Sequence, residues 1–179
     1  MVSFVVCLRC KFFFEVRIGV IAIITVGLPA SGKTSYAESL PAFLNINRDE
    51  IRVEVTGKRD DHSQERVVQQ YAHEQIAKAA REGKGIIISD TNINRLHRKQ
   101  LVKHLQEMGY DVEAHLFNVG PKTCVERNSS RSHPVPANTI YSMAKALQEH
   151  PPSYDEGYTQ MVMLEQEGAM PLFSRSRFS

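Results

Sequence analysis

The chain has 179 residues, enough for one domain with a sizeable hydrophobic core, and its 42% hydrophobic and 23% charged residues are typical of a globular protein. The formal net charge of +2 is too small to indicate nucleic-acid binding by itself, so binding to such a polymer needs a local basic patch. Three cysteines are too few for a disulfide scaffold and favour a reducing compartment, and no run approaches the ~18 consecutive apolar residues of a membrane span.

Residues 1–19 are expected to form an N-terminal extension to which no function is assigned. They are rich in Phe and Val but are interrupted by charged residues, and they lack the pattern of a secretory signal. Cys7 and Cys10 form a C-x-x-C pair, but no second pair exists, so metal or redox chemistry is disfavoured. An extra edge strand or a poorly ordered segment is expected here.

Residues 27–34, with the sequence GLPASGKT, match the phosphate-binding pattern G-x-x-x-x-G-K-[ST] at every fixed position. They follow a strand-like run at residues 20–26 and open a helical stretch at residues 33–40, which is the context of a nucleotide site rather than of a chance glycine turn. Glycines let the backbone point its N–H groups at phosphate oxygens, and the helix start adds more. The sequence therefore predicts a site for ATP or another nucleoside triphosphate, formed by Gly27, Pro29, Ser31, Gly32, Lys33, Thr34 and Ser35.

Farther along the chain, strands are predicted to alternate with helices, which indicates an α/β sandwich with a central parallel sheet. The expected strands lie at residues 43–47, 85–90 and 110–119, and the expected helices at residues 49–57, 61–83, 95–109, 121–127 and from 136 onward. Asp49 is expected to cap the first of these helices, and Asp61 with Gln64 to form a capping box for the second. Residues 20–150 are predicted to be the nucleotide-binding domain, and residues 151–179 a mixed C-terminal tail.

Two carboxylates follow the second and third predicted strands, at the edge of a parallel sheet where ligands bind. Asp90 is expected to support Mg²⁺, or else to cap a helix or turn. Asp49 is the expected general base for an acceptor hydroxyl, or else a plain helix cap. Arg52 lies three residues after Asp49 on the same helix face, so both side chains can address one acceptor.

Phosphoryl transfer also needs positive charge around the transferred group, and Thr34 is expected to supply an oxygen to nucleotide-bound Mg²⁺. Arg127 and Arg131 are one helical turn apart, just before a proline-containing break at residues 133–136 where a short lid is expected; the alternative is a solvated basic helix end. The helix at residues 95–104 is also basic. It either follows a polynucleotide backbone or is a solvated face, and the second interpretation is favoured.

Several of these blocks, taken in order, resemble the 5′-polynucleotide kinases of the bacteriophage T4 type over about residues 20–150. The matching blocks are residues 27–34, NINRD at 45–49, IISDTN at 87–92, ERNSSR at 126–131 with VP at 135–136, and YSM at 141–143. In three respects the chain differs from that family: residues 1–19 have no counterpart in it, Asp49 is followed by Glu50 instead of a second Asp, and the chain contains no Asp-x-Asp-x-Thr motif of a 3′-phosphatase domain.

The resemblance implies a P-loop NTPase fold, an adenylate-kinase-like three-layer sandwich, and transfer of the γ-phosphate of ATP, with Mg²⁺, to 5′-OH ends of DNA or RNA. It implies Lys33, Asp49 and Arg131 as catalytic residues, Arg52 as the contact to the 3′-side phosphate of the acceptor, and Asp90 as a further active-site carboxylate. Phosphatase and ligase activities are then expected from other chains, and the cytoplasm, of the host if the gene belongs to a phage, is the expected location.

Two other functions remain open at this point. A small-molecule kinase that acts on a nucleoside, nucleotide or other metabolite uses the same scaffold, and the near-neutral charge fits it equally well. A nucleotide-binding module without turnover is disfavoured because it needs no acceptor-side base such as Asp49.

Overall fold

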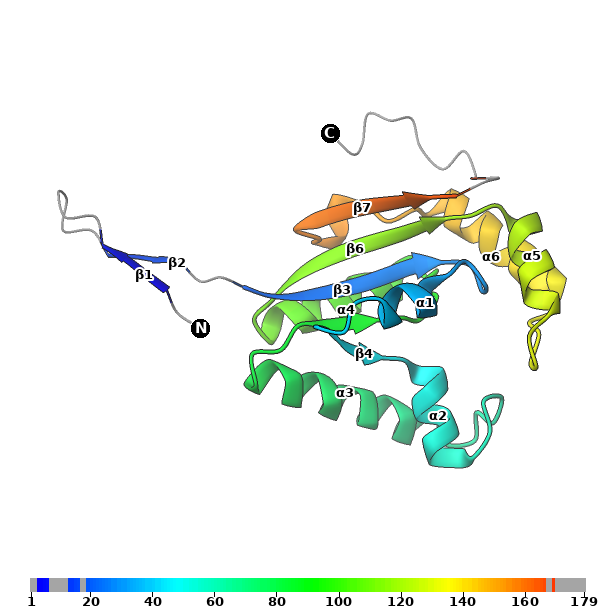
Figure 1. Ribbon diagram of the computed structural model, residues 1–179, viewed down its shortest axis with the longest axis horizontal. Coiled ribbons are helices and arrows are strands. Elements are labelled where there is room, and N and C mark those ends of the chain that lie inside the picture. Colours follow the sequence, from blue (N-terminus) through cyan, green and yellow to red (C-terminus); the bar gives the residue numbers. More distant parts are fainter. Residues whose placement is uncertain (1–2, 7–12, 17–18, 167–168, 170–179) are drawn as a thin grey trace.

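The computed structural model describes residues 3–6, 13–16, 19–166 and 169, and a five-stranded sheet forms its centre (Figure 1). The strands are β3 (Val20–Gly27), β4 (Leu44–Ile46), β5 (Ile86–Ile88), β6 (Tyr110–Asn118) and β7 (Gln160–Glu165). They lie in the order β4-β5-β3-β6-β7, and every neighbouring pair is parallel. The predicted α/β fold with a central parallel sheet is therefore confirmed.

Helices connect these strands and cover the sheet. They are α1 (Lys33–Glu38), α2 (Arg48–Thr56), α3 (Glu65–Arg81), α4 (Arg95–Glu107), α5 (Pro121–Ser129), α6 (Ala137–Glu149) and the short 3-10 helix η1 (Tyr154–Glu156). Within the described ranges, no helix is both long enough and apolar enough to cross a membrane.

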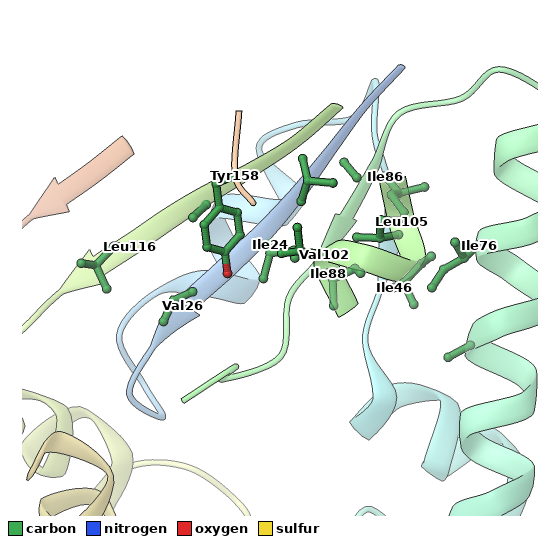
Figure 2. Packing of buried hydrophobic residues seen from close by; sticks show 14 of the residues in the cluster. Ile24, Val26, Ile46, Ile76, Ile86, Ile88, Val102, Leu105, Leu116 and Tyr158 are labelled. Carbon is green, nitrogen blue, oxygen red and sulfur yellow. The ribbon is translucent and has the colours of Figure 1, made fainter. Parts of the chain in front are cut away.

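The alternation of side chains along β3 divides the core into two layers, one on each face of the sheet. Ala22, Ile24 and Val26 pack with apolar residues of α3, α4 and α6, whereas Ile23 faces α1 and packs with Ala37. Figure 2 shows the larger cluster, which includes Ile46, Ile76, Ile86, Ile88, Val102, Leu105, Leu116 and Tyr158. The three predicted layers are thus the helices α3, α4 and α6 on one face, the sheet in the middle, and helix α1 on the other face.

Residues 151–166, expected to belong to a mixed tail, differ from that expectation. They contribute η1 and then β7, which pairs with β6 from Glu113↔Gln160 to Asn118↔Glu165. The apolar run at residues 161–164 is only four residues long, which is a weak signal for a strand in the sequence, and its side chains are only partly buried in the structure.

Near the N-terminus, β1 (Ser3–Val6) and β2 (Phe13–Val16) form an antiparallel pair of their own rather than an extra edge strand of the central sheet. Cys7 and Cys10 lie outside the described residues, and the domain boundary placed at residue 20 stays a prediction.

The capping box predicted at the start of α3 is wrong. Asp61 Oδ1 accepts a hydrogen bond from the Ser63 N–H (2.9 Å), and α3 begins at Glu65 without a side-chain cap from Gln64. Asp61 thus forms a local turn before the helix, which is the competing use of an Asp side chain at such a position.

A buried ion pair joins η1 to α4. Arg98 Nε and Nη2 donate to the two carboxylate oxygens of Glu156, each at 2.7 Å, and both side chains are 0% exposed. The same guanidinium donates to the carbonyl oxygens of Asn92, Ile93 and His150, so its remaining hydrogen-bonding capacity is used. Arg98 therefore ties the loop that follows β5 to the ends of α6 and η1.

Substitution of Glu156→Gln should lower the free energy of unfolding by about 3–5 kcal/mol, because it leaves the buried Arg98 charge without its partner. Urea denaturation followed by circular dichroism measures this change. The control is Glu149→Gln, which removes an exposed carboxylate 3.9 Å from Lys145 and should have little effect. Equal stabilities of the two variants would contradict the structural role of the pair.

Candidate active site

The phosphate-binding loop runs from the end of β3 to the start of α1, and its backbone explains two of its residues. Gly32 has a φ of 99°, a left-handed conformation that favours glycine. A Cβ on Gly27 would lie 2.9 Å from Phe117 Cβ and 3.2 Å from the Phe117 carbonyl oxygen, so a side chain here would push β3 and β6 apart. Both glycines are therefore required by the local geometry.

Lys33 is buried under this loop. Its Nζ donates to the Leu28 carbonyl oxygen (2.6 Å) and to Ser31 Oγ (3.2 Å). Burial lowers the pKa of Lys33 from 10.5 to about 8, and the positive charge of Arg131 acts in the same direction. An anionic ligand bound next to this buried ammonium group would strongly stabilise its charged form.

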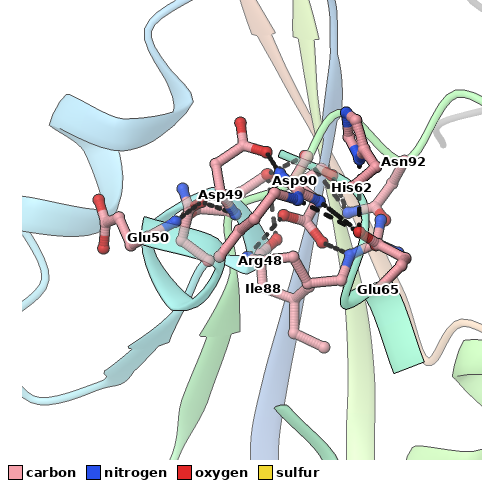
Figure 3. A network of polar contacts seen from close by, with 12 residues as sticks. Arg48, Asp49, Glu50, His62, Glu65, Ile88, Asp90 and Asn92 are labelled. Carbon is pink, nitrogen blue, oxygen red and sulfur yellow. Dashed lines mark hydrogen bonds and ion pairs between the residues drawn. The ribbon is translucent and has the colours of Figure 1, made fainter. Parts of the chain in front are cut away.

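The ends of β4 and β5 are held together by two polar contacts. Asn47 Nδ2 donates to Ser89 Oγ (3.0 Å), and Arg48 forms an ion pair with Asp90, which also accepts a hydrogen bond from the Arg48 backbone N–H (3.1 Å). Figure 3 shows Arg48 and Asp90 within this polar network. Asp90 thus accepts the free backbone N–H of the first residue of α2, as a helix cap does, and also pairs with the Arg48 side chain, so that it fixes the start of α2 against β5.

Asp49 lies in the first turn of α2, and the expectation that it caps this helix is wrong. The cap is Asn47, whose Oδ1 accepts from the backbone N–H groups of Asp49 (2.9 Å) and Glu50 (3.3 Å). The Asp49 carboxylate is therefore not used in capping and its side chain is 53% exposed. Sequence reasoning placed the cap two residues late, because Asn47 and Asp49 are both good capping residues.

Arg52 is buried and holds Asp49. Its Nη1 donates to Asp49 Oδ1 (2.6 Å) and to the Arg59 carbonyl oxygen (3.2 Å), while its Nη2 and Nε donate to the Glu65 carboxylate at 3.1–3.3 Å. Each of its three nitrogens thus has a protein acceptor, and its side chain is only 6% exposed. Glu65, at the start of α3, was not singled out from the sequence because a Glu in the first helical turn is common.

A cleft of about 960 Å³ brings most of the predicted site residues together. Those that line it are Pro29, Gly32, Lys33, Thr34, Ser35, Asp49, Arg52, Asp90, Arg127 and Arg131. Gly27 and Ser31 are buried in or beside the phosphate-binding loop and do not line the cleft. The arrangement places a phosphate-binding loop, a carboxylate and cationic side chains around one cavity.

Oxygen donors suitable for Mg²⁺ are present in this cleft. The Thr34 hydroxyl and the Asp90 carboxylate both line it, and such hard oxygen ligands match the ion. No group of three or more His, Cys, Asp or Glu side chains suited to a metal occurs in the part of the chain that the structure describes, so binding would depend on the nucleotide phosphates as well.

Sequence reasoning missed four cleft residues with cationic or imidazole side chains: Arg48, Arg59, His62 and His133. Arg59 and His62 lie in the connection between α2 and α3, and His133 lies in the connection between α5 and α6, where no periodic pattern marks a residue. Gln166 was also missed. Its Oε1 accepts from Arg127 Nη1 (2.7 Å), so the residue after β7 contacts this candidate nucleotide arginine.

The basic helix α4 does not contribute to the cleft. Arg95 and Lys99 form ion pairs with Asp155, and Lys103 lies 3.9 Å from Glu107. The structure thus supports the interpretation of this helix as a solvated, ion-paired face.

The fold and this cleft define a P-loop nucleotide-binding protein of the α/β class. A family model described as AAA domain matches residues 23–150, and the chain belongs to this family. Nucleotide binding is the property that the family and the loop share.

Comparison with known proteins supports the resemblance to polynucleotide kinases. A protein of Autographa californica nuclear polyhedrosis virus, named as a bifunctional polynucleotide kinase/RNA ligase, is 32% identical over 130 residues. This match covers 65% of the chain and 19% of the viral protein, so the chain spans about a fifth of the length of that relative.

Two solved structures have the same fold. One is the Pnkp1/Rnl/Hen1 RNA repair complex, with a TM-score of 0.62 and 18% identity over 73% of this chain and 45% of that chain. The other is a gluconokinase from Sinorhizobium meliloti 1021, with a TM-score of 0.51 and 18% identity over 87% of each chain. At these identities the likeness concerns the fold alone.

The lowered pKa of Lys33 predicts that nucleotide binding depends on pH. Below pH 8 the ammonium is already charged, whereas above pH 8 the free protein must take up a proton to present it, so affinity should fall by up to about tenfold per pH unit. Calorimetric titration with ATP at pH 7 and pH 9, in buffers of different ionisation enthalpy, measures both the affinity and the proton uptake.

The matched control for this titration is Lys145→Met, on the exposed face of α6, which should keep the proton uptake at pH 9. An unchanged affinity between pH 7 and pH 9 in the native protein would show that Lys33 stays fully charged.

Proposed function

We propose that the chain is an ATP-dependent 5′-hydroxyl polynucleotide kinase, which transfers the γ-phosphate of ATP to 5′-OH ends of DNA or RNA. One observation carries the proposal: the Asp49 carboxylate is held by Arg52 in the same cleft as the phosphate-binding loop. A protein that only binds a nucleotide needs no such acceptor-side carboxylate. The viral relative named as a polynucleotide kinase/RNA ligase supports the same reaction.

The proposed reaction assigns one role to each group. Asp49 accepts the proton of the 5′-hydroxyl, whose oxygen attacks the γ-phosphorus while the bond to the β-phosphate oxygen breaks and ADP leaves. Lys33 binds the β- and γ-phosphates, and Arg127 and Arg131 balance the charge that develops on them. Mg²⁺, when bound through Thr34 and Asp90, would supply charge neutralisation at the phosphates.

Further parts of the proposal concern the surroundings of the protein. We propose that the kinase acts together with phosphatase and ligase activities in end repair, supported by the kinase/RNA ligase name of the viral relative and by the RNA repair complex among the structures of like fold. The proposed location is the cytoplasm, of the host if the gene is viral, which agrees with the small number of cysteines.

The test measures transfer of label from γ-labelled ATP by the purified protein in the presence of Mg²⁺. The acceptor is either a 5′-OH oligonucleotide or one of a panel of nucleosides, nucleotides and gluconate. Label on the oligonucleotide supports the proposal. Label on a monomer alone would make the protein a small-molecule kinase, and nucleotide binding without any transfer would make it a binding module.

Asp49→Asn should lower the rate of transfer at saturation by about 10²–10⁴-fold, which is typical of the loss of a general base, while ATP still binds. The control is Asp60→Asn, which removes an exposed carboxylate from the connection between α2 and α3 and should leave the rate unchanged. If instead ATP affinity collapses and the saturated rate holds, Asp49 has a structural role.

Lys33→Ala should abolish phosphoryl transfer because it removes the cation that contacts the β- and γ-phosphates. The same labelled-ATP assay measures it, with Lys145→Ala as the matched lysine control. Turnover retained in Lys33→Ala would contradict the assignment of the phosphate-binding loop.

A further inference from the structure

The contacts of Arg52 leave open which residue binds the phosphates of the acceptor strand. The family resemblance assigned the 3′-side phosphate of the acceptor to Arg52. In the structure, however, each nitrogen of this guanidinium donates to Asp49, Glu65 or the Arg59 carbonyl oxygen, and the side chain is 6% exposed. A phosphate that bound these nitrogens would compete with Asp49 and Glu65, whose side chains are 53% and 32% exposed, for the Arg52 guanidinium.

Arg59 lies beside Asp49, and His62 lies beside Glu65, the two carboxylates that Arg52 contacts. Arg59 Nη1 lies 3.6 Å from Asp49 Oδ2, a long ion pair, and the Arg59 side chain is 46% exposed. His62 Nδ1 lies 3.4 Å from Glu65 Oε2, and its side chain is 69% exposed. Both residues line the cleft, so a group bound beside Asp49 can reach them without displacing a close partner.

The charge of the cleft favours a polyanion more than the charge of the whole chain does. Among the described residues that line the cleft there are six Lys or Arg and three Asp or Glu side chains. The whole chain has 22 Lys and Arg and 20 Asp and Glu residues. Nucleic-acid binding by a chain of such low net charge needs a local basic patch, and the cleft, rather than α4, provides one.

We propose that Arg59, with His62, forms a subsite for the backbone phosphates that follow the 5′ nucleotide of the acceptor, and that Arg52 is a positioning residue for Asp49. The proposal rests on the function proposed above and specifies the substrate class of that site as a polynucleotide strand. The α2–α3 connection is therefore the part of the protein that distinguishes a strand from a metabolite.

The test compares Arg59→Gln with Arg66→Gln, which removes the same charge from an exposed position on α3 outside the cleft. In Arg59→Gln, the KM for a 5′-OH oligonucleotide should rise about tenfold or more, because a charge-assisted contact to phosphate is lost. The kcat and the KM for ATP should change little. The slope of log affinity against log salt for a single strand, measured by fluorescence anisotropy, should decrease in magnitude by about 0.7.

Two further variants separate the roles. His62→Gln should raise the oligonucleotide KM by a smaller factor, because imidazole contributes less charge than guanidinium. Arg52→Gln should lower kcat more than it raises the oligonucleotide KM, because it releases Asp49. Circular dichroism of each variant verifies that it is folded.

The outcomes distinguish this proposal from the proposed function. No label on any oligonucleotide with the native protein would overturn both. Label on the oligonucleotide, together with an Arg59→Gln variant whose KM and salt slope match those of Arg66→Gln, would overturn the subsite alone. A fall in kcat of Arg59→Gln at unchanged KM would also overturn it, because Arg59 would then serve Asp49 rather than the strand.

Discussion

The common direction of the five strands in the central sheet is the constraint from which the site follows. Because the sheet is parallel, the residues that follow β3, β4 and β5 meet at one edge, although they are far apart in the chain. β3 lies in the middle of the strand order, so the loop at residues 28–32 occupies the point where the connections diverge to the two sides, the usual place for a ligand in such sheets. Side-chain contacts then fix this edge in detail: Asn47 to Ser89, and Arg48 to Asp90.

On the acceptor side, hydrogen bonding among charged groups decides which side chains remain free for a substrate. Arg52 is surrounded by two carboxylates, and a buried guanidinium with such partners is costly to expose or to leave unpaired. Its geometry holds one oxygen of Asp49 in place and leaves the carboxylate accessible at the cleft. In the subsite that we propose, these contacts keep Arg52 at Asp49, and Arg59, whose side chain is 46% exposed, meets the backbone phosphates.

The parts of the site that could be predicted from the sequence are those in which a local pattern fixes the structure. The loop at residues 27–34 combines fixed spacing with a preceding strand, and Asp90 ends an apolar run, so both were placed correctly at the sheet edge. The helix cap was misplaced because Asn47 and Asp49 have similar capping preference, and only the hydrogen bonds distinguish them. Arg59 could not be found from its neighbours, because its position depends on how the α2–α3 connection folds back over Asp49.

The two basic regions of the chain show why net charge is a poor guide to the substrate. Asp155 of η1 and Glu107 of α4 lie beside basic side chains of α4, so this helix face carries ion pairs. In the cleft the acids are fewer than the bases, and Asp49 is engaged by a buried arginine. A kinase for a neutral metabolite needs cations only around the transferred phosphates, the role proposed here for Lys33 and Arg131. The exposed Arg59 and His62 side chains near Asp49 and Glu65 have a chemical use when the acceptor itself carries phosphates, and this favours a phosphate-bearing acceptor such as a polynucleotide over a neutral metabolite.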